Sequence, residues 1–344
     1  MVKTLTIVGA RPQFIKAAPV IKLLDNDILV HTGQHYDDNM SNIFFEGLSI
    51  KEPDYNLDVG SGSHNYMVTT MMQKLEDVIK LEKPDTVIVY GDTNSTLAGA
   101  VIAKEMGIRL VHVEAGLRSY NMSMPEERNR IITDKLSDVL LCPTTNAYHT
   151  LAKEMLHTNA QVVGDTMYDL LMENGFFLDK SKLAKWDLMP KSYYLCTLHR
   201  PVNVDNLDKL KIIFDAFGEL DKDVLFPCHP RTQKKLNYIF VPENVQIIDP
   251  VGYFDMMTLA VNADKILTDS GGLQKEAHML EVPCVTLRDE TEWIESVECG
   301  ANKLCKINKA DIIATINSEY DIETSYTYGD GDASKKIVKA ICEV

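Results

Sequence analysis

Carboxylate side chains directly follow two predicted strands in the first half of the chain, and a third begins a predicted helix. Asp92 follows the strand predicted over Thr86–Tyr90, and Glu114 follows the one predicted over Arg109–Val113. Glu126 stands near the start of the next predicted helix. Each taken alone could cap or complement a helix. Three carboxylates at one sheet edge instead predict acid–base chemistry, because clustered carboxyl groups push each other's pKa values apart.

Two basic residues follow the first predicted strand, Thr4–Val8. Gly9 permits a tight turn, and Arg11 and Lys16 lie at the start of the helix expected from Pro12. A helix N-terminus attracts anions through its free N–H groups and its dipole. These cations are therefore candidates for anion binding, the alternative being two solvated charges.

Hydrogen-bond donors follow the strands of the second half. His199-Arg200 and His229 each follow a predicted strand, and both histidines have an arginine nearby, which favours an anionic ligand. Ser270-Gly-Gly272 opens a helix directly after a strand, where backbone N–H groups can approach a diphosphate closely. Glu276 lies one turn inside that helix, where a carboxylate can accept a ribose diol. A plain tight turn is the alternative for Ser270–Gly272.

Nucleotide motifs of the common kinds are absent from the sequence. Gly9-Ala10-Arg11 breaks the G-x-G-x-x-G fingerprint, and no G-x-x-x-x-G-K-[ST] occurs. The seven cysteines contain no C-x-x-C pair, which is typical of reduced core residues rather than of a disulfide framework or a zinc site. We therefore expect chemistry that uses neither a redox cofactor nor a metal ion.

Strands and helices alternate from end to end, as in parallel α/β proteins. We predict strands over residues 4–8, 28–32, 86–90, 109–113, 139–142, 161–163, 193–197, 224–227, 245–248, 265–268, 283–286 and 303–305. Predicted helices include residues 12–24, 64–81, 94–106, 125–136, 206–220, 231–239, 254–261, 272–280, 309–319 and 333–343. Ligands of open α/β sheets bind beyond the carboxyl ends of the strands, where the residues above stand.

A length of 344 residues predicts two domains. We place the boundary near Gly164, giving a domain over 1–164, a UDP-binding domain over 165–331, and a last helix, 332–344, that packs back on the first domain. The net charge of −15 argues against nucleic acid as a partner. No apolar stretch reaches the length of a membrane span and no leader peptide is evident, so we expect a cytoplasmic protein.

Ordered motifs along essentially the whole chain resemble the non-hydrolysing UDP-N-acetylglucosamine 2-epimerase family. They are Gly9–Lys16, Gly91–Thr93, His112–Leu117, Pro125–Glu127, Leu198–Arg200, Thr268–Gly272 with Gln274 and Glu276, Leu287–Glu292, and Tyr328–Gly331. The resemblance implies a glycosyltransferase-B-like fold of two Rossmann-like, doubly wound domains facing a cleft, and a homodimer. It also implies a UDP-sugar substrate and a reaction by anti elimination of UDP and re-addition through a 2-acetamidoglucal.

The resemblance also assigns roles to residues. It implies that Asp92, Glu114 and Glu126 form the acid–base set, with Lys16, His199 and His229 in or near the site. It implies that Glu276 holds the ribose. It implies that the diphosphate is held by Arg11, His199, Ser270 and Gly271. The other residues implied to bind the substrate or UDP are Arg200, His229, Gly272 and Arg288.

Some segments depart from members that act on N-acetylglucosamine. The first motif reads Ala10-Arg-Pro-Gln-Phe14 rather than Thr-Arg-Pro-Glu-Ala, and Trp293 stands after Thr291-Glu292 where those members have arginine. This form is closer to the branch that epimerises UDP-2,3-diacetamido-2,3-dideoxy-glucuronate. The loop Gly33–Met40 keeps Gln34-His35 but otherwise differs from the segment that binds an activating UDP-sugar in bacterial members.

Two other functions remain open from the residues. A glycosyltransferase of the same fold would need an acceptor groove, and the sequence shows no aromatic or basic patch typical of one. A non-catalytic nucleotide-sugar sensor could lose the carboxylates, yet all three are present. The sequence does not specify the substituents at C3 and C6 of the sugar.

Overall fold

The computed structural model describes residues 2–33, 50–175, 180–228, 230–323 and 327–343, and its contacts divide the chain into two compact units. Unit 1 comprises Met1–Asn174 and Tyr326–Val344, and unit 2 comprises Gly175–Ser325. The boundary predicted near Gly164 precedes helix α7 (Thr166–Asn174), whereas the contacts place α7 in unit 1.

Unit 1 is built on a parallel sheet of seven strands in the order β3-β2-β1-β4-β5-β6-β7. The strands are β1 Thr4–Val8, β2 Asp27–His31, β3 Tyr55–Asn56, β4 Thr86–Tyr90, β5 Arg109–Val113, β6 Val139–Cys142 and β7 Ala160–Val162. The other helices are α1 Arg11–Ile21, α3 His64–Glu82, α4 Asn94–Glu105, α5 Pro125–Leu136, α6 Thr145–Lys153, the short 3₁₀ helix η1 His157–Asn159, and α15 Ala333–Cys342.

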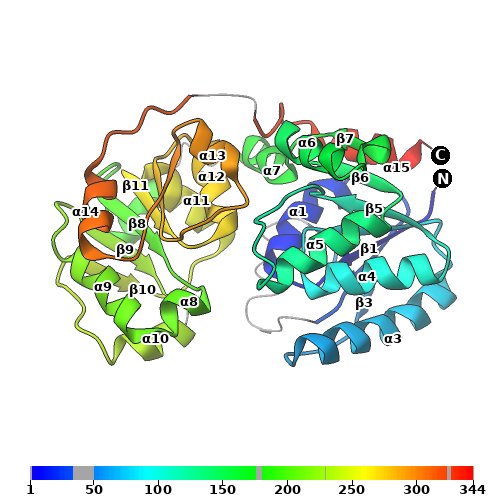
Figure 1. The fold of residues 1–344 in the computed structure, drawn as a ribbon, viewed down its shortest axis with the longest axis horizontal. Coiled ribbons are helices and arrows are strands. Elements are labelled where there is room, and N and C mark those ends of the chain that lie inside the picture. The colour runs from blue at the N-terminus through cyan, green and yellow to red at the C-terminus, as the bar shows by residue number, and fades with distance from the viewer. Residues whose placement is uncertain (1, 34–49, 176–179, 229, 324–326, 344) are drawn as a thin grey trace. The chain divides into compact units, whose positions relative to one another are not determined.

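Helices cover both faces of this sheet (Figure 1). Helix α1 connects β1 to β2 in one direction, and α3, α4 and α5 connect strands in the opposite direction. Right-handed crossovers that run in opposite directions put their helices on opposite faces. Accordingly α3, α4 and α5 pack together on one side, and α1 packs with α7 and α15 on the other.

Unit 2 repeats this plan with a parallel sheet of six strands in the order β10-β9-β8-β11-β12-β13. The strands are β8 Tyr193–Thr197, β9 Asp223–Pro227, β10 Val245–Ile248, β11 Lys265–Thr268, β12 Cys284–Thr286 and β13 Asn302–Leu304. The helices are η3 Lys180–Trp186, α8 Pro201–Val204, α9 Leu207–Phe217, α10 Pro230–Leu236, α11 Tyr253–Asn262, α12 Gly271–Met279, α13 Ile294–Glu298 and α14 Lys309–Asn317. The prediction of two Rossmann-like α/β units is confirmed.

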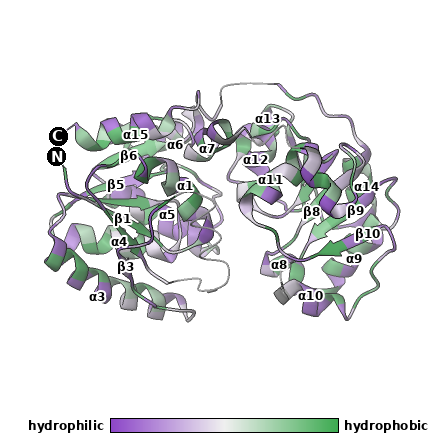
Figure 2. Ribbon diagram, turned by 180° about the vertical axis from the view of Figure 1, so that it is seen from behind, coloured by the Kyte–Doolittle hydropathy of each residue, from purple (hydrophilic) through white to green (hydrophobic). Residues whose placement is uncertain are grey.

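Apolar strands flanked by amphipathic helices form a separate core in each unit (Figure 2). In unit 1, strand residues such as Leu5, Ile7 and Val87 are fully buried beneath α3 and α4. In unit 2, Phe214, Phe217 and Phe226 form the aromatic centre of the core. Near-continuous apolar strands are expected where both faces of a parallel sheet are covered. Among the described helices, none is both long and apolar enough to span a bilayer.

Helix α15 returns to unit 1 and is fixed at both ends by polar contacts. The Asp169 carboxylate in α7 accepts hydrogen bonds from the N–H groups of Ala333 (3.0 Å) and Ser334 (2.6 Å) at its start. The Arg109 guanidinium donates to the carbonyls of Ile341 (2.7 Å) and Ala340 (3.0 Å) near its end. A carboxylate at the N-terminus and a cation at the C-terminus both complement the helix dipole.

Strand β3 was not predicted from the sequence. It is two residues long and pairs with the end of β2, so it has no periodicity of its own. The Asp54 carboxylate just before it accepts a hydrogen bond from the N–H of Leu29 in β2 (2.8 Å), which fastens this edge of the sheet. Such an edge strand depends on contacts with β2 rather than on its own sequence pattern.

Candidate active site

The strand order reverses at one point in each sheet, and the predicted site residues gather there. In unit 1 the reversal lies between β1 and β4, and in unit 2 between β8 and β11. The residues that follow these strands are Gly9–Lys16 and Gly91-Asp92 in unit 1, and His199-Arg200 and Asp269–Gly272 in unit 2. Open α/β sheets bind ligands at this switch point. Each unit therefore carries a candidate half-site.

The turn from β1 into α1 is closed by a glutamine side chain. The Gln13 Oε1 accepts hydrogen bonds from the N–H groups of Gly9 (2.9 Å) and Ala10 (3.1 Å), and the side chain is almost fully buried. Gly9 has no room for a side chain, since a Cβ would lie 2.1 Å from Thr32 Oγ1. Helix α1 begins at Arg11, one residue before the predicted start. The backbone donors that hold phosphate in nucleotide-binding folds are thus satisfied internally here.

Lys16 and Glu114 form an ion pair beside the turn that carries Asp92. The Lys16 Nζ donates to Glu114 Oε2, and the two side chains are only 15% and 8% exposed. A Cβ on Gly91 would lie 3.1 Å from that Glu114 oxygen and 3.3 Å from the Lys16 Nζ. The Lys16 Nζ and the Glu114 carboxylate therefore both lie beside Gly91, which directly follows β4. A largely buried carboxylate–ammonium pair at a strand end is suited to moving a proton to or from a bound substrate.

Glu114 adopts an unusual backbone conformation for a residue that carries a side chain. Its φ angle is +72°, in the left-handed region. Such conformations cost on the order of 1–3 kcal/mol and cluster at functional sites. The N–H groups of Glu114 and Ala115 both donate to the Leu141 carbonyl at 3.0 Å, which holds the turn in place.

Asp92 is paired with an arginine from α5 that was not predicted from the sequence. The Arg130 Nη2 donates to Asp92 Oδ2, and Arg130 Nη1 donates to Glu127 Oε2 at 3.1 Å. Arg130 is 4% exposed, whereas Asp92 is 29% exposed. The cation thus lies inside the protein and presents the carboxylate at the edge of the sheet.

The two neighbouring glutamates of α5 have different environments. Glu127 is fully buried and accepts hydrogen bonds from the N–H groups of Ser119 (2.9 Å) and Tyr120 (2.8 Å). Glu126, the predicted acid–base residue, is exposed on the first turn of α5. The structure therefore brings Lys16 and Glu114 together beside Asp92, with Glu126 on an adjacent helix.

A buried charge network lies beneath Glu114. The Asp134 carboxylate accepts from His112 Nδ1 (2.7 Å), Arg118 Nη1 (2.7 Å) and the Gly116 N–H (3.2 Å). Burial alone would raise the pKa of the Asp134 carboxyl, but the hydrogen bond from His112 and the charges of His112 and Arg118 hold that pKa below its usual value. Asp134 is thus an anion that fixes the segment following β5.

In unit 2 a buried aspartate organises the turn after β8. The Asp269 carboxylate accepts from the N–H groups of His199 (3.0 Å) and Arg200 (3.1 Å) and from Asn203 Nδ2 (3.1 Å). Asp269 is fully buried, while the His199 side chain is 56% exposed. The aspartate therefore fixes the backbone of the two predicted ligand-binding residues, of which His199 is exposed and Arg200 is 24% exposed.

The start of α12 combines backbone donors with two charged side chains. Ser270 caps the helix by accepting from the Leu273 N–H (3.4 Å). A Cβ on Gly271 would lie 2.2 Å from Glu292 Oε1, so glycine is needed for this approach. Glu292 in turn accepts from Arg288 Nη2 (3.1 Å). The buried Arg288 Nη1 has no hydrogen-bond partner among the described residues, as expected of a group that meets an anionic ligand.

The remaining predicted residues lie in α12 or outside the described residues. Glu276 lies in α12, one turn beyond Gly272, and is 5% exposed. His229 lies outside the described residues, as do Gln34-His35 and the loop around them. Among the residues that the structure does describe, no three His, Cys, Asp or Glu side chains lie together as a possible metal site.

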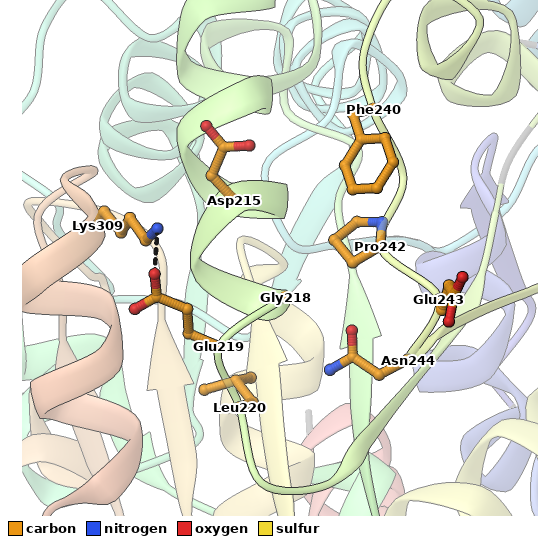
Figure 3. Close-up of a pocket in the computed structure, with 9 residues that line it drawn as sticks. All are labelled: Asp215, Gly218, Glu219, Leu220, Phe240, Pro242, Glu243, Asn244 and Lys309. Carbon is orange, nitrogen blue, oxygen red and sulfur yellow. Dashed lines mark ion pairs between the residues drawn. The ribbon is translucent and has the colours of Figure 1, made fainter.

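A surface pocket in unit 2 lies away from these residues (Figure 3). It is lined by the end of α9, the turn before β9, and Lys309, which pairs with Glu219. The remaining lining residues are Phe240, Pro242, Glu243 and Asn244. Leu220 and Asn244 precede β9 and β10, so the pocket lies at the amino edge of the sheet. His199 and Ser270 follow strands at the opposite edge. The pocket is therefore separate from the candidate half-site.

Five of the seven cysteines are buried, as predicted for core residues, namely Cys142, Cys196, Cys228, Cys284 and Cys305. Cys299 is only partly buried and Cys342 is exposed, so the prediction was wrong for these two. Burial raises the pKa of the Cys142 and Cys284 thiols to about 12. Such thiols stay protonated at neutral pH.

Comparison with known proteins gives one consistent family. The family model for UDP-N-acetylglucosamine 2-epimerase matches residues 24–342. A UDP-N-acetylglucosamine 2-epimerase homolog of Methanococcus maripaludis is 46% identical over 98% of this chain and 99% of its own. A UDP-2,3-diacetamido-2,3-dideoxy-D-glucuronate 2-epimerase of Pseudomonas aeruginosa is 44% identical over 99% of this chain and 100% of its own.

A solved structure confirms the fold class. The crystal structure of Methanocaldococcus jannaschii UDP-GlcNAc 2-epimerase, in complex with UDP-GlcNAc and UDP, has a TM-score of 0.90 and 40% identity. It covers 98% of this chain and 99% of its own. The glycosyltransferase-B-like class predicted from the sequence is therefore confirmed.

Proposed function

The chain belongs to the UDP-N-acetylglucosamine 2-epimerase family, a family of isomerases, and from this premise we propose that it epimerises UDP-N-acetylglucosamine at C2 to UDP-N-acetylmannosamine. The observation that carries the proposal is the pair of ion pairs at the carboxyl edge of unit 1, Lys16–Glu114 and Arg130–Asp92. They supply two carboxylates, which follow the neighbouring strands β4 and β5. Support also comes from the Methanocaldococcus relative, whose structure holds UDP-GlcNAc and UDP.

The proposed reaction begins with an anti elimination. The C2–H bond and the bond from C1 to the diphosphate oxygen break, the C1=C2 double bond of a 2-acetamidoglucal forms, and UDP departs with the electron pair. A proton then returns to the opposite face of C2 while UDP adds again to C1. Substrate and product have the same oxidation state, so the reaction requires no redox cofactor.

Unit 1 supplies the acid–base groups in this proposal. Asp92 is partly exposed and Glu114 is largely buried; each follows a strand and has a cationic partner. Glu126 completes the set from α5, with Lys16 of unit 1 and His199 of unit 2 assisting proton movement. General acid–base groups typically contribute about 10²–10⁴-fold each.

Unit 2 holds UDP in this proposal. The C2 proton is not acidic, so departure of the diphosphate requires strong assistance from donors aimed at the developing charge. Glu276 accepts the ribose hydroxyls, and His229 lies near the site. The donors proposed for the diphosphate are Arg11, His199, Arg200, Ser270, Gly271, Gly272 and Arg288.

A second candidate substrate is UDP-2,3-diacetamido-2,3-dideoxy-glucuronate. Two observations favour it, the 44% identity to the Pseudomonas enzyme and the segment Thr291-Glu292-Trp293 beside the start of α12. Trp293 is buried and its ring lies 4.6 Å from the Lys275 Nζ, a cation–π contact beneath the proposed diphosphate site. The same elimination and re-addition would apply. We also expect a cytoplasmic homodimer.

Proton NMR in D₂O tests the proposal. The purified protein is incubated with UDP-N-acetylglucosamine and, in parallel, with the 2,3-diacetamido uronate. Deuterium at C2 with a manno product from the first sugar is the expected result, and Glu114→Gln should slow both. Turnover of the uronate alone would move the protein to that branch. Transfer of the sugar to an acceptor, with no exchange at C2, would favour a glycosyltransferase instead.

A further inference from the structure

Three consecutive backbone carbonyls at the end of β4 are each bound by a buried side chain. The Tyr90 carbonyl accepts from Gln13 Nε2 (2.8 Å), the Gly91 carbonyl from His112 Nε2 (2.7 Å), and the Asp92 carbonyl from Asn129 Nδ2 (3.0 Å). We call these three donors, Gln13, His112 and Asn129, the carbonyl clamp. They come from three different elements, α1, β5 and α5.

Each donor of the carbonyl clamp is fixed in orientation by a second contact. Gln13 is held through its Oε1 by the N–H groups that follow β1. His112 is held through Nδ1 by Asp134, and Asn129 also donates to Asn94 Oδ1 (3.2 Å). All three clamp side chains are at most 2% exposed. The Tyr90 carbonyl also accepts from Thr96 Oγ1 (2.6 Å), so it keeps one partner if the Gln13 donor is lost, whereas a buried carbonyl that loses its only partner pays the full desolvation cost.

The two ring nitrogens of His112 have different partners. The Gly91 carbonyl can only accept, so His112 Nε2 donates to it. His112 Nδ1 faces Asp134 Oδ1, while the other carboxylate oxygen, Oδ2, accepts from Arg118 and from the Gly116 N–H. The buried Asp134 therefore fixes the orientation of the ring that binds the Gly91 carbonyl.

The elements that supply the carbonyl clamp also carry the candidate catalytic groups. Helix α1 carries Lys16, Glu114 directly follows β5, and α5 carries Arg130, the partner of Asp92. Gly91 itself has a φ angle of +62°, so this turn does not form from strand and helix propensity alone. The clamp therefore ties the Asp92 turn to each element whose side chain must act with it.

We infer that Gln13, His112 and Asn129 are positioning residues that set Asp92 in register with Glu114 and Lys16 for the proton transfers at C2. The inference rests on the proposed function for the role of Asp92. Misplacement of a reacting group by about 1 Å can cost on the order of 10²-fold in rate. Loss of one clamp donor should therefore lower kcat without changing the affinity for UDP, whose proposed donors lie mainly in unit 2.

Isosteric substitutions test the inference. Asn129→Asp and Gln13→Glu each replace a donating NH₂ by an accepting oxygen at constant size. We expect kcat to fall by about 10–100-fold, with the Kd for UDP within twofold of wild type by calorimetry. Asn262→Asp is the matched control, because the buried Asn262 Nδ2 also donates to a carbonyl, that of Thr258 (2.9 Å), but in unit 2. Its kcat should match that of wild type.

A double-mutant cycle separates positioning from general damage. If Asn129 acts through Asp92, then Asn129→Asp should slow the wild-type enzyme but have little further effect in the Asp92→Asn background. Equal effects in both backgrounds, or an Asp92→Asn variant as active as wild type, would overturn the inference. If the Asn129→Asp protein cannot be produced in folded form, Asn129→Ala replaces it in the cycle, since alanine removes the donor without adding a charge.

An activity-independent readout keeps this test distinct from that of the proposed function. If wild-type protein exchanges no proton at C2 of either sugar, the proposed function fails. The effect of the carbonyl clamp on the Asp92 turn is then tested by measuring the rates of amide hydrogen exchange over residues 90–95. Faster exchange there in Asn129→Asp but not in Asn262→Asp supports the clamp, and unchanged exchange refutes it.

Discussion

Replacing Asp269 by asparagine should loosen the turn that carries His199 and Arg200. Asparagine keeps the size of aspartate, but one carboxylate oxygen becomes an NH₂ group. Oδ2 accepts from the Arg200 N–H and from Asn203, whereas Oδ1 accepts from the His199 N–H. The amide keeps more bonds if its oxygen takes the Oδ2 position. Its NH₂ then faces the His199 N–H, donor against donor.

The size of the effect follows from these contacts. One hydrogen bond to a charged acceptor is lost, at about 1.5–3 kcal/mol, and two others become neutral and weaker. We therefore expect the free energy of unfolding of unit 2 to fall by about 2–4 kcal/mol. Because His199 and Arg200 are proposed donors to the diphosphate, UDP binding should weaken by about tenfold or more, or about 1.4 kcal/mol.

Urea unfolding followed by tryptophan fluorescence measures the stability directly. Both tryptophans of the chain, Trp186 and Trp293, belong to unit 2. Calorimetry gives the Kd for UDP. Asp264→Asn is the control at the other end of the same strand, β11, where a half-exposed aspartate pairs with Lys222 at 3.0 Å. That variant should change stability by no more than about 0.5 kcal/mol and leave UDP binding unchanged.

Two results would contradict this reasoning. An Asp269→Asn protein with the wild-type unfolding midpoint and Kd would show that the carboxylate does not hold the turn. A lower midpoint with an unchanged Kd would show that Asp269 supports the fold without positioning His199 or Arg200 for the ligand.

Three further predictions concern unit 1. Asp169→Asn should lower the stability of unit 1 by about 1–2 kcal/mol in thermal unfolding, because the carboxylate caps α15; an unchanged midpoint would contradict this. Gly116→Ala should lower the free energy of unfolding by about 3 kcal/mol or prevent folding, since the added Cβ would lie 2.4 Å from the Ala147 carbonyl oxygen. Gly107→Ala is the control: the space around Gly107 is open, so the free energy of unfolding should fall by only about 1–2 kcal/mol because of the positive φ angle. The pKa of Asp134 is lower in the folded protein than its ordinary value of 3.8 in the unfolded chain. The ionised carboxylate therefore stabilises the folded protein above pH 3.8, and this stabilisation is lost as the pH falls through the folded-state pKa. Acid unfolding followed by circular dichroism should therefore steepen below about pH 4 in wild type and be shallower in Asp134→Asn.

The fold was largely predictable because its cores are made of regular apolar strands between amphipathic helices. The predicted strands agree with β1, β4, β5 and their counterparts in unit 2 to within a residue or two. The exception, β3, is held by pairing with β2 and by Asp54, which are contacts between distant segments. A local sequence pattern does not contain such information.

Candidate site residues could be predicted where they directly follow a strand, and could not be predicted where they lie on the buried face of a helix. Glu114 and Ser270 were found from their position after a strand. Glu127, Arg130 and Asp134 lie on the buried face of α5, three or four residues apart, so that face is charged rather than apolar. A search for apolar periodicity therefore assigns these residues to solvent. For the same reason it does not distinguish the buried Glu127 from the exposed Glu126.

The return of α15 to unit 1 also affects how the protein is made. The ribosome begins unit 1, then makes all of unit 2, and only afterwards makes the helix whose Ile337 and Ile341 are buried in unit 1. Until that helix emerges, the nascent surface of α1 and α7 that receives it stays uncovered. Domains usually fold in order during synthesis, N-terminal first. Here unit 2 can fold on the ribosome before α15, the last helix of unit 1, has been synthesised. We therefore expect chaperones to bind unit 1 rather than unit 2 during synthesis.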